Sequence, residues 1–224
     1  RNCDVATFEQ AVWALIKRGY YVVRDGRQVA KGMPWHTYAL WDSHVIDFAM
    51  RQPYDDFMAI YLGAKCAFCL STGTGPDAIP VIFRRPVCYV DYVPLEYLQT
   101  YHRGSLAIWK HHYKEDCDDA CKATHMSGYE VLHVKRRMTP AEIYASGAGH
   151  FMRAEQFAEA GITLVDNTPE EITAAALEMA EGLSTDDQSA FWRDFPRSKS
   201  TYNAAPLHGE IRMRIGREFL KGYA

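Results

Sequence analysis

Hydrophobic positions along the chain alternate between two spacings, one typical of helices and the other of short strands. Apolar residues recur at helical spacing from Val5 to Ile16, and Gly19 then supplies a helix stop signal. A run of aromatic and β-branched residues follows over 20–24 and ends in the turn pair Asp25-Gly26. The alternation continues, with strands predicted over 45–48, 66–70 and 87–90 and helices over 55–65 and 76–83.

The second half of the chain regains this pattern after an interruption. From 92 to 137 the periodicity weakens and His, Lys and Tyr become frequent, so an irregular insertion is expected there. Two capping boxes, Thr139 to Glu142 and Thr168 to Glu171, predict helix starts, and a strand over 162–165 precedes the second of them. One last helix is indicated by the spacing of Ile211, Ile215 and Phe219.

The predicted fold is therefore of the α/β class. Strands that alternate with helices at this spacing predict βαβ units, and we expect one Rossmann-like, three-layer domain over residues 1–224 with a mainly parallel sheet. Within it, the helix over 55–65 places on one face the residues Phe57, Ile60, Tyr61 and Ala64. A chain of 224 residues is long enough to bury a full core without disulfides.

Composition and charge narrow the classes of function. The chain has 25 basic and 28 acidic side chains and a formal net charge of −3, which argues against a general binder of nucleic acid. An aromatic content of 13% excludes intrinsic disorder. No apolar run approaches the roughly 20 residues of a membrane span and no signal peptide is visible, so a cytoplasmic, reducing environment is expected for the six cysteines. Because the chain begins at Arg1 instead of Met, we expect a missing N-terminal domain.

The clearest candidate for ligand binding is the loop Ser71-Thr72-Gly73-Thr74-Gly75, which follows a predicted strand and precedes a helix. In open α/β sheets ligands bind beyond the carboxyl ends of the strands, where such loops lie. Glycines let the backbone approach a ligand, hydroxyls hydrogen-bond to it, and a helix N-terminus favours an anion, so the loop is predicted to cradle a phosphate. A tight turn with a Ser/Thr cap is the other interpretation. The loop lacks the lysine of a P-loop and a dinucleotide fingerprint, which disfavours ATP hydrolysis and NAD binding.

Two further strand ends carry candidate ligand-binding side chains. Arg24 ends an otherwise apolar strand, and its guanidinium can clamp phosphate oxygens; a surface arginine is the alternative interpretation. Asp166, Asn167 and Thr168 follow the strand over 162–165 and can hydrogen-bond a sugar or a ribose, although Thr168 as a simple helix cap explains part of this pattern.

A metal site and a catalytic triad are both disfavoured. Cys117 and Cys121 could ligate zinc together with nearby histidines, namely His102, His111, His112, His125 and His133. Their spacing matches no closed zinc motif, however, and neighbouring aspartates indicate a solvated acidic turn, so no metal or cofactor is predicted. The chain has no GxSxG element. No catalytic base is assigned, because Asp47 and His36 are supported only by their places near a strand end.

The chain carries a set of segments that include these motifs: 19–26, 45–49, 56–62, 66–68, 71–75, 85–86, 161–172 and 214–220. Together they resemble a bacterial glycosyltransferase-like family over almost the whole chain, most weakly between 92 and 137. The resemblance implies the C-terminal, donor-binding half of a two-domain (GT-B type) glycosyltransferase, which binds a nucleotide-activated sugar, usually without a metal. It also implies that Arg24 meets the diphosphate, that Ser71 to Gly75 cradle the phosphates, and that Asp166 and Asn167 lie near the sugar or nucleotide. Asp25 departs from the family, which often has an apolar residue there.

The expected function is thus transfer of a sugar from a nucleotide-activated donor to a bacterial glycan or another acceptor. The resemblance also implies that the base activating the acceptor commonly comes from the N-terminal half. Two alternatives remain open: a non-catalytic module that binds a nucleotide sugar or a phosphoglycan, and another α/β enzyme that processes sugar nucleotides. The second alternative requires clustered carboxylates or metal ligands, which do not appear with suitable spacing.

Overall fold

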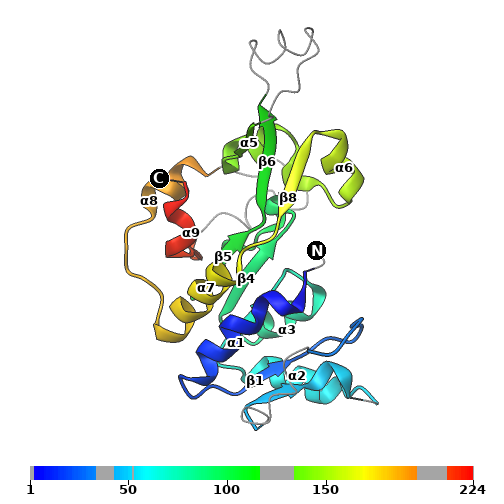
Figure 1. The fold of residues 1–224 in the computed structure, drawn as a ribbon. Helices are drawn as coiled ribbons and strands as arrows, with labels where there is room; N and C mark the ends of the chain where they lie inside the picture. Colours follow the sequence, from blue (N-terminus) through cyan, green and yellow to red (C-terminus); the bar gives the residue numbers. More distant parts are fainter. Residues whose placement is uncertain (1–2, 34–42, 52, 117–133, 196–210, 224) are drawn as a thin grey trace.

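The computed structural model describes residues 3–33, 43–51, 53–116, 134–195 and 211–223. At its centre lies a parallel sheet of four strands in the order β3-β4-β5-β9 (Figure 1). These strands are β3 (Cys69–Ser71), β4 (Val87–Tyr92), β5 (Leu106–Trp109) and β9 (Arg214–Ile215). Every residue of β4 and β5 is buried, as expected for parallel strands that are covered on both faces.

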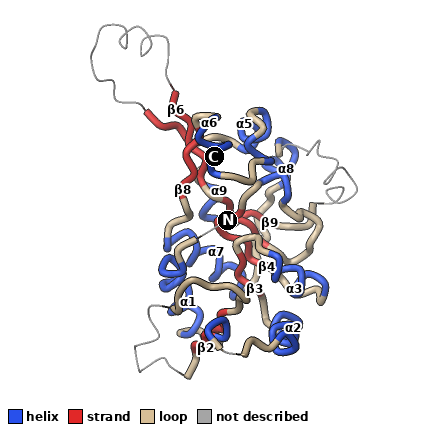
Figure 2. Tube along the Cα trace, turned by 90° about the vertical axis from the view of Figure 1, so that its right-hand side faces the viewer, coloured by secondary structure: helices blue, strands red, loops and turns tan. Residues whose placement is uncertain are grey.

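Helices cover both faces of this sheet, as Figure 2 shows. On one side α1 (Glu9–Ile16) packs against α7 (Pro169–Glu181), and α7 also contacts β4 and β5. On the other side lie α2 (Asp56–Lys65) and α3 (Ala78–Ile82), which contact each other. The core between these layers includes Trp109, which is completely buried. The predicted α/β class, with a parallel sheet and flanking helices, is confirmed.

A second parallel pair, β1 (Val22–Arg24) and β2 (Val45–Asp47), forms its own two-stranded sheet. The ring of Tyr20, which precedes β1, lies edge-on to that of Phe68, which precedes β3, with 5.9 Å between the ring centres. β1 therefore begins close to the start of β3. The short helix η2 (Phe48–Met50) follows β2 directly.

A small antiparallel sheet continues the fold beyond β5 (Figure 1). β6 (His111–Asp116) follows β5 after one intervening residue, and it pairs with β7 (Val134–Arg137) and β8 (Ile162–Val165). The stretch 92–137, which the sequence predicts to be irregular, instead contains β5, β6 and β7 in its described part. The polar side chains of β6 obscure the strand pattern, because their partners lie far away in the sequence. The strand predicted over 162–165 is confirmed, but it pairs in the antiparallel direction.

The remaining helical segments are short. They are η1 (Val5–Phe8), η3 (Gly75–Asp77), η4 (Leu95–Tyr97), α5 (Pro140–Ala145), η5 (Ala148–His150), α6 (Ala154–Glu159), α8 (Ser189–Asp194) and α9 (Arg217–Lys221). Both predicted capping boxes are present, one before α5 and one before α7. The prediction of a last helix that includes Ile215 is wrong: this residue is buried in β9, where pairing with β5 outweighs the helical spacing, and α9 begins after it. No described helix is both long and apolar enough to cross a membrane.

Candidate functional site

Polar side chains gather where the strands of the parallel sheet end. Thr72 directly follows β3, Asp91 lies near the end of β4, and Lys110 directly follows β5. β8 runs antiparallel to β6 and returns the chain to this edge, where Asp166 and Asn167 precede α7. Ligands of parallel α/β sheets bind at this edge. We call these five residues the edge cluster.

Cys3, close to the N-terminus, shows that these loops meet. The side chain of Thr72 lies near its thiol and lowers the pKa of that thiol. Burial and the charge of Asp91 raise the pKa of the Cys3 thiol, the charge of Lys110 lowers it, and the charge of Asp166 raises it. Four segments that are remote in sequence therefore act on one sulfur atom.

Asn167 connects the start of α7 to two strands. Its side-chain oxygen accepts a hydrogen bond from the Asp91 backbone N–H at 2.7 Å, and its amide nitrogen Nδ2 donates to the Trp109 carbonyl at 2.9 Å. Its own backbone N–H donates to Asp91 Oδ1 at 2.5 Å. Because Asn167 is only 2% exposed and both ends of its side chain are engaged, the structure gives it a positioning role. Its predicted contact with a sugar or nucleotide stays a prediction.

Asp91 is a buried carboxylate on an unusual backbone. It is completely buried, and its φ of 51° lies in the left-handed region that non-glycine residues rarely adopt. Burial raises the pKa of the Asp91 carboxyl, while the Asn167 N–H and the charge of Lys110 oppose this rise. Its Oδ2 atom has no hydrogen-bond partner among the described residues. Strained backbone and a buried titratable group are both typical of functional sites.

Lys110 and Asp166, both members of the edge cluster, form an ion pair. The Lys110 ammonium contacts Asp166 Oδ1, and the two side chains are 7% and 41% exposed, respectively. A molecule that approaches this edge therefore meets the carboxylate first and finds the ammonium behind it. The pair presents both an acceptor for hydroxyl groups and a cation for an anionic group.

A second group of hydrogen-bonded polar residues lies next to the Lys110–Asp166 pair. His111 Nε2 lies 2.9 Å from Glu171 Oε2, which also accepts from the Thr168 backbone N–H at 2.9 Å. The Thr168 hydroxyl in turn accepts from the Glu171 N–H at 3.2 Å. Although burial raises the pKa of Glu171, the hydrogen bonds from His111 and Thr168 lower it below its usual value. Thr168 is thus the helix cap that one interpretation of the sequence proposed.

The Ser71 to Gly75 loop is held by bonds within itself. The Ser71 hydroxyl donates to Asp77 Oδ2 at 3.1 Å and accepts from the Gly73 N–H at 3.1 Å. Thr74 and Gly75 are exposed, and Thr74 makes no side-chain cap to η3. The hydroxyl and N–H that were candidates for a phosphate are therefore engaged with the protein, and the Asp77 carboxylate stands beside them. Of the loop, Thr72 alone acts on the Cys3 thiol, whose pKa Asp91, Lys110 and Asp166 also shift.

Replacing Gly73 with alanine is expected to destabilise the protein by about 1–2 kcal/mol, because left-handed backbone is costly for any residue with a Cβ. Gly73 has a φ of 76°, and a Cβ there would lie 2.6 Å from the Tyr92 ring. Gly75→Ala is the matched control, since a Cβ at Gly75 meets no atom within 4 Å. Chemical denaturation measures both variants, and equal stabilities would show that the Tyr92 ring and the loop adapt without cost.

Arg24 forms its hydrogen bonds with residues outside the edge cluster. Its Nη1 donates to the Lys31 carbonyl at 2.8 Å and to Asp47 Oδ2 at 3.2 Å, and Asp47 Oδ2 also accepts from the Met33 N–H at 2.9 Å. Arg24 and Asp47 are register partners in the β1–β2 sheet. Among the described residues, Arg24 forms no hydrogen bond or ion pair with the edge cluster or with the Ser71 loop. Asp47, considered from sequence as a base, serves as the partner of Arg24, and His36 lies outside the described residues.

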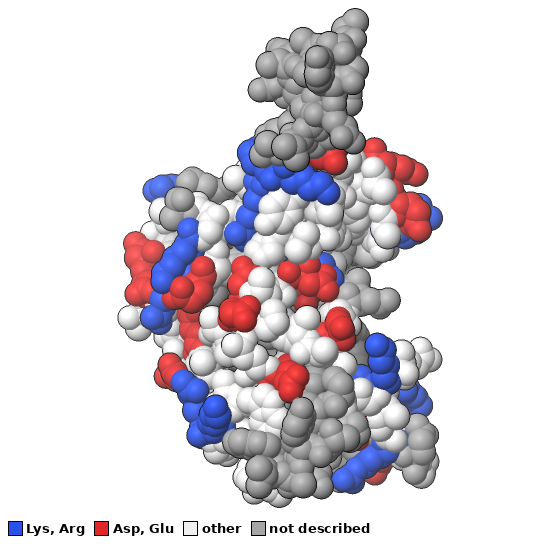
Figure 3. Space-filling model, viewed as in Figure 1, with Lys and Arg blue, Asp and Glu red and all other residues white. Residues whose placement is uncertain are grey.

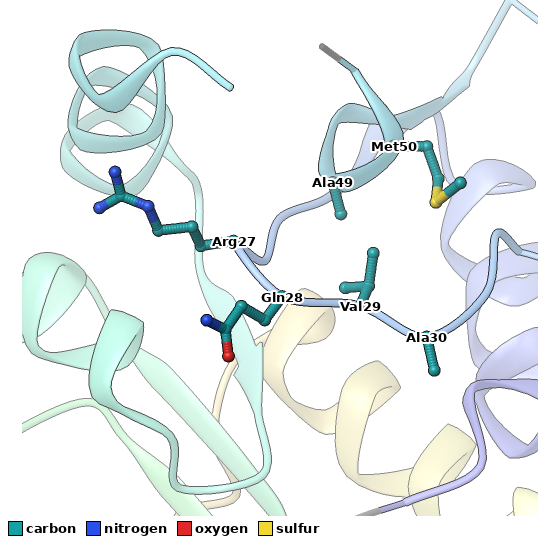
Figure 4. A pocket seen from close by; sticks show the side chains of 6 residues that line it. All are labelled: Arg27, Gln28, Val29, Ala30, Ala49 and Met50. Carbon is teal, nitrogen blue, oxygen red and sulfur yellow. The ribbon is translucent and has the colours of Figure 1, made fainter. Parts of the chain in front are cut away.

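A shallow hollow of about 530 Å³ lies at the carboxyl ends of β1 and β2 (Figure 4). It is lined by Arg27, Gln28, Val29, Ala30, Ala49 and Met50. In Figure 4 the Val29 side chain points toward Ala49, whereas that of Arg27 points away from them. Arg27 Nη2 also forms an ion pair with Asp56 Oδ2 at 3.4 Å. With one cation and no carboxylate in its lining, the hollow offers less chemistry than the edge cluster.

The described residues contain no group of three or more side chains that could hold a metal ion. Cys117, Cys121, His125 and His133 lie outside the described residues. The three described histidines of the predicted set have separate partners, which are Ser105 for His102, Glu171 for His111 and the Lys110 carbonyl for His112. The described cysteines form no disulfide with one another; they are Cys3, Cys66, Cys69 and Cys88.

A buried carboxylate that holds a histidine was not found from sequence. Glu96, almost completely buried, bonds through Oε2 to Nε2 of the half-exposed His150 at 2.8 Å. Gly149 allows this approach, because a Cβ there would lie 2.6 Å from Glu96 Cγ. The Tyr97 ring lies edge-on to His150, and the Tyr97 carbonyl accepts from the Tyr92 hydroxyl at 2.7 Å. The Tyr92 ring also lies against Gly73, in the loop that follows β3. The Glu96–His150 pair is therefore close to the edge of the sheet at which that loop lies.

Comparison with family models, with curated proteins and with solved structures finds no match to this chain. Its function is therefore argued from the edge cluster and from the residues that surround it.

Proposed function

We propose that this chain is a Rossmann-like, donor-binding domain of a GT-B type glycosyltransferase, which binds a nucleotide-activated sugar at the carboxyl edge of its parallel sheet. The observation that carries the proposal is the convergence of Thr72, Asp91, Lys110 and Asp166 from four separate segments. A parallel sheet between helices, with polar groups at this edge, is the arrangement with which many α/β proteins bind nucleotides. The resemblance of the sequence motifs to a glycosyltransferase-like family supports the same substrate class.

The edge cluster offers groups for both parts of such a donor. Lys110 supplies a cation and Thr72 a hydroxyl for the phosphates, and the Asp166 carboxylate accepts hydrogen bonds from hydroxyls of the sugar or ribose. A phosphate would compete with Asp166 for the Lys110 ammonium. The resemblance adds Arg24 and the Ser71 to Gly75 loop as phosphate ligands, and these stay predictions.

In the proposed reaction the bond between the anomeric carbon and the diphosphate oxygen breaks, and the diphosphate keeps the electron pair. The acceptor oxygen, on a bacterial glycan or another hydroxyl-bearing molecule, bonds to the anomeric carbon and passes its proton to a base that remains unassigned. Lys110 would stabilise the charge that develops on the diphosphate. As the resemblance implies, neither a metal nor a cofactor takes part.

Thermal-shift measurements with UDP, GDP, ADP, dTDP and CMP, each with and without EDTA, test whether the chain binds such a donor. At 100 times its dissociation constant a ligand should stabilise the fold by about 2.7 kcal/mol, which is a readable change in Tm. We expect one nucleotide to raise the Tm regardless of EDTA. The absence of a shift from all five would contradict the proposal.

Lys110→Met is expected to weaken the binding of that nucleotide about 10- to 100-fold, because it removes a charged hydrogen-bond donor. Lys114→Met, on the exposed part of β6, is the matched control and should bind like the unaltered chain. Titration calorimetry measures both affinities, and circular dichroism establishes that each variant is folded. A folded Lys110→Met variant with unchanged affinity would remove Lys110 from the site.

Whether Arg24 binds the diphosphate has to be tested in a variant whose Asp47 side chain carries no charge. Arg24→Ala alone would leave the mostly buried Asp47 carboxylate without its cation, so a loss of binding could reflect a disturbed β1–β2 sheet. The comparison is therefore made in an Asp47→Asn background. A further loss of affinity there would assign Arg24 to the diphosphate, and unchanged affinity would exclude it.

A non-catalytic binding module would use the same edge cluster. The two functions differ in turnover, since only an enzyme releases free nucleoside diphosphate from a nucleotide sugar. Release of the diphosphate, by slow hydrolysis or on addition of glycan acceptors, identifies the enzyme; binding without release identifies the module.

A further inference from the structure

A buried carboxylate and a half-exposed imidazole form a pair beyond the end of β4. Glu96 lies in η4 and is 3% exposed, and its Oε2 atom bonds to Nε2 of His150 in η5, whose side chain is 41% exposed. The Tyr97 ring lies edge-on to the imidazole, with 6.3 Å between the ring centres. Glu96 and Tyr97 together hold the imidazole in one orientation.

The bond to Glu96 determines which nitrogen of His150 carries the proton. An ionised carboxylate only accepts hydrogen bonds, so Nε2 is the donor and Nδ1 keeps its lone pair. Among the described residues Nδ1 has no hydrogen-bond partner. A histidine held in this way can accept a proton at its free nitrogen, and the buried carboxylate stabilises the imidazolium that forms.

The pair lies at the edge of the sheet where the donor is proposed to bind. Figure 1 places α5 and α6, which flank η5 in the sequence, on the side toward which β6 continues from β5. The Tyr92 hydroxyl donates to the Tyr97 carbonyl at 2.7 Å, and the Tyr92 ring lies against Gly73 of the loop after β3. Two tyrosines therefore connect His150 to the loop that is predicted to cradle the phosphates. Tyr92 also directly follows Asp91 of the edge cluster.

Three other titratable side chains at this edge are inaccessible or engaged. Asp91 is completely buried, and Asp166 already holds a lysine in an ion pair. The His111 side chain is 7% exposed and is paired with Glu171. His150 differs from all three because it combines an exposed ring, a free nitrogen and a buried carboxylate partner.

We infer that His150 is the catalytic base of the transfer and that Glu96 is its positioning residue; this inference rests on the proposed function. The acceptor hydroxyl gives its proton to His150 Nδ1 while its oxygen bonds to the anomeric carbon of the donor. The bond from that carbon to the diphosphate oxygen breaks, and the diphosphate leaves with the electron pair. The Glu96 carboxylate stabilises the imidazolium until the proton passes to solvent.

The charge of the chain favours an uncharged acceptor. The formal net charge is −3. Figure 3 shows Asp and Glu side chains across the middle of one face, where Figure 1 places α7. Carboxylates on such a face repel an anionic polymer. We therefore expect the hydroxyl group of a neutral sugar to reach His150.

Release of nucleoside diphosphate from sugar nucleotides, with methyl glucoside, methyl galactoside and methyl mannoside as acceptors, tests His150. The sugar nucleotides carry the base that the thermal-shift measurements identify. His150→Gln keeps a donor for Glu96 but has no basic nitrogen, so we expect kcat to fall about 100- to 10,000-fold. The nucleotide affinity, measured by titration calorimetry, should stay unchanged. His44→Gln is the matched control and should react like the unaltered chain, because His44 contacts Ser43 and Tyr21 instead.

Glu96→Gln tests the positioning residue, since it keeps the size of the side chain and removes its charge. We expect kcat to fall about 10- to 100-fold with an unchanged KM for the donor, because the charge acts only once the imidazolium forms. Circular dichroism establishes that each variant is folded. Added imidazole should restore part of the activity of His150→Ala, and failure of this rescue would assign His150 a structural role.

The possible outcomes separate this inference from the proposed function. A folded His150→Gln variant with unchanged kcat would overturn the inference. Nucleotide binding by the unaltered chain without release of diphosphate would also overturn it, but would leave the proposed donor binding in place. A chain that binds no nucleotide would refute the proposed function, and the inference with it.

Discussion

Replacing Asn167 with leucine is expected to lower the free energy of unfolding by about 3–5 kcal/mol, because two buried backbone groups lose their partner. The substitution keeps a similar volume but removes the acceptor for the Asp91 N–H and the donor for the Trp109 carbonyl. Asn167 is 2% exposed, so water does not readily take the place of its amide. Each buried polar group left unsatisfied costs about 1–3 kcal/mol. Denaturation in guanidinium chloride at neutral pH measures the loss.

A neighbouring cap provides the control for this variant. Thr168→Ala removes only the bond to the Glu171 N–H and is expected to cost about 0.5–2 kcal/mol. If Asn167→Leu cost no more than Thr168→Ala, the proposed link between α7 and the ends of β4 and β5 would be wrong. Asp91→Ala combined with Asn167→Leu should lose less than the sum of the two single losses, because they break the same network.

The alternation of helices and strands could be predicted because its signals are local. Gly19 after α1, the capping boxes and the buried run that became β4 all act within a few residues of the element that they define. β6 was missed for the opposite reason. Its first two residues are histidines, and Nε2 of His111 bonds to Glu171, which is 60 positions further along the chain. Such a strand has no alternating pattern of apolar residues to reveal it.

The candidate site was only partly predictable for the same reason. Thr72 and Asp166 follow from the rule that strand ends carry ligand-binding groups. Asp91 and Lys110 also stand at strand ends, but their neighbourhood was interpreted as the start or interior of an irregular insertion. Arg24 stands at the end of a strand as predicted, yet its partner is set by the register of β1 with β2. The helix α2 shows the converse: the spacing of Phe57, Ile60 and Tyr61 identifies an apolar face, but it does not reveal that this face is exposed.

Acidification is expected to weaken the fold through His112. This side chain is completely buried, and Nδ1 donates to the Lys110 carbonyl at 2.8 Å, while Nε2 has no partner among the described residues. Burial lowers the pKa of His112 from 6.5 to about 4, so the folded protein keeps the ring neutral over a range in which the unfolded chain protonates it. The unfolded state therefore binds more protons between these two values, and the free energy of unfolding falls as the pH is lowered through them.

The expected size of this loss is about 3 kcal/mol over the whole window and about 2 kcal/mol between pH 7 and pH 5. His112→Leu removes the titrating group, so its stability at pH 7 and pH 5 should differ by about 2 kcal/mol less than that of the unaltered chain. His102, whose pKa burial also lowers, and Asp91, whose pKa burial raises, are present in both proteins and cancel in this comparison. Glu142, whose pKa is lowered to about 2 chiefly by a hydrogen bond from Arg136, affects stability below its usual titration range near 4.5 and stays outside the measurement. Equal pH dependence in the two proteins would show that His112 is protonated in the folded state, and hence that the junction of β5 and β6 admits water.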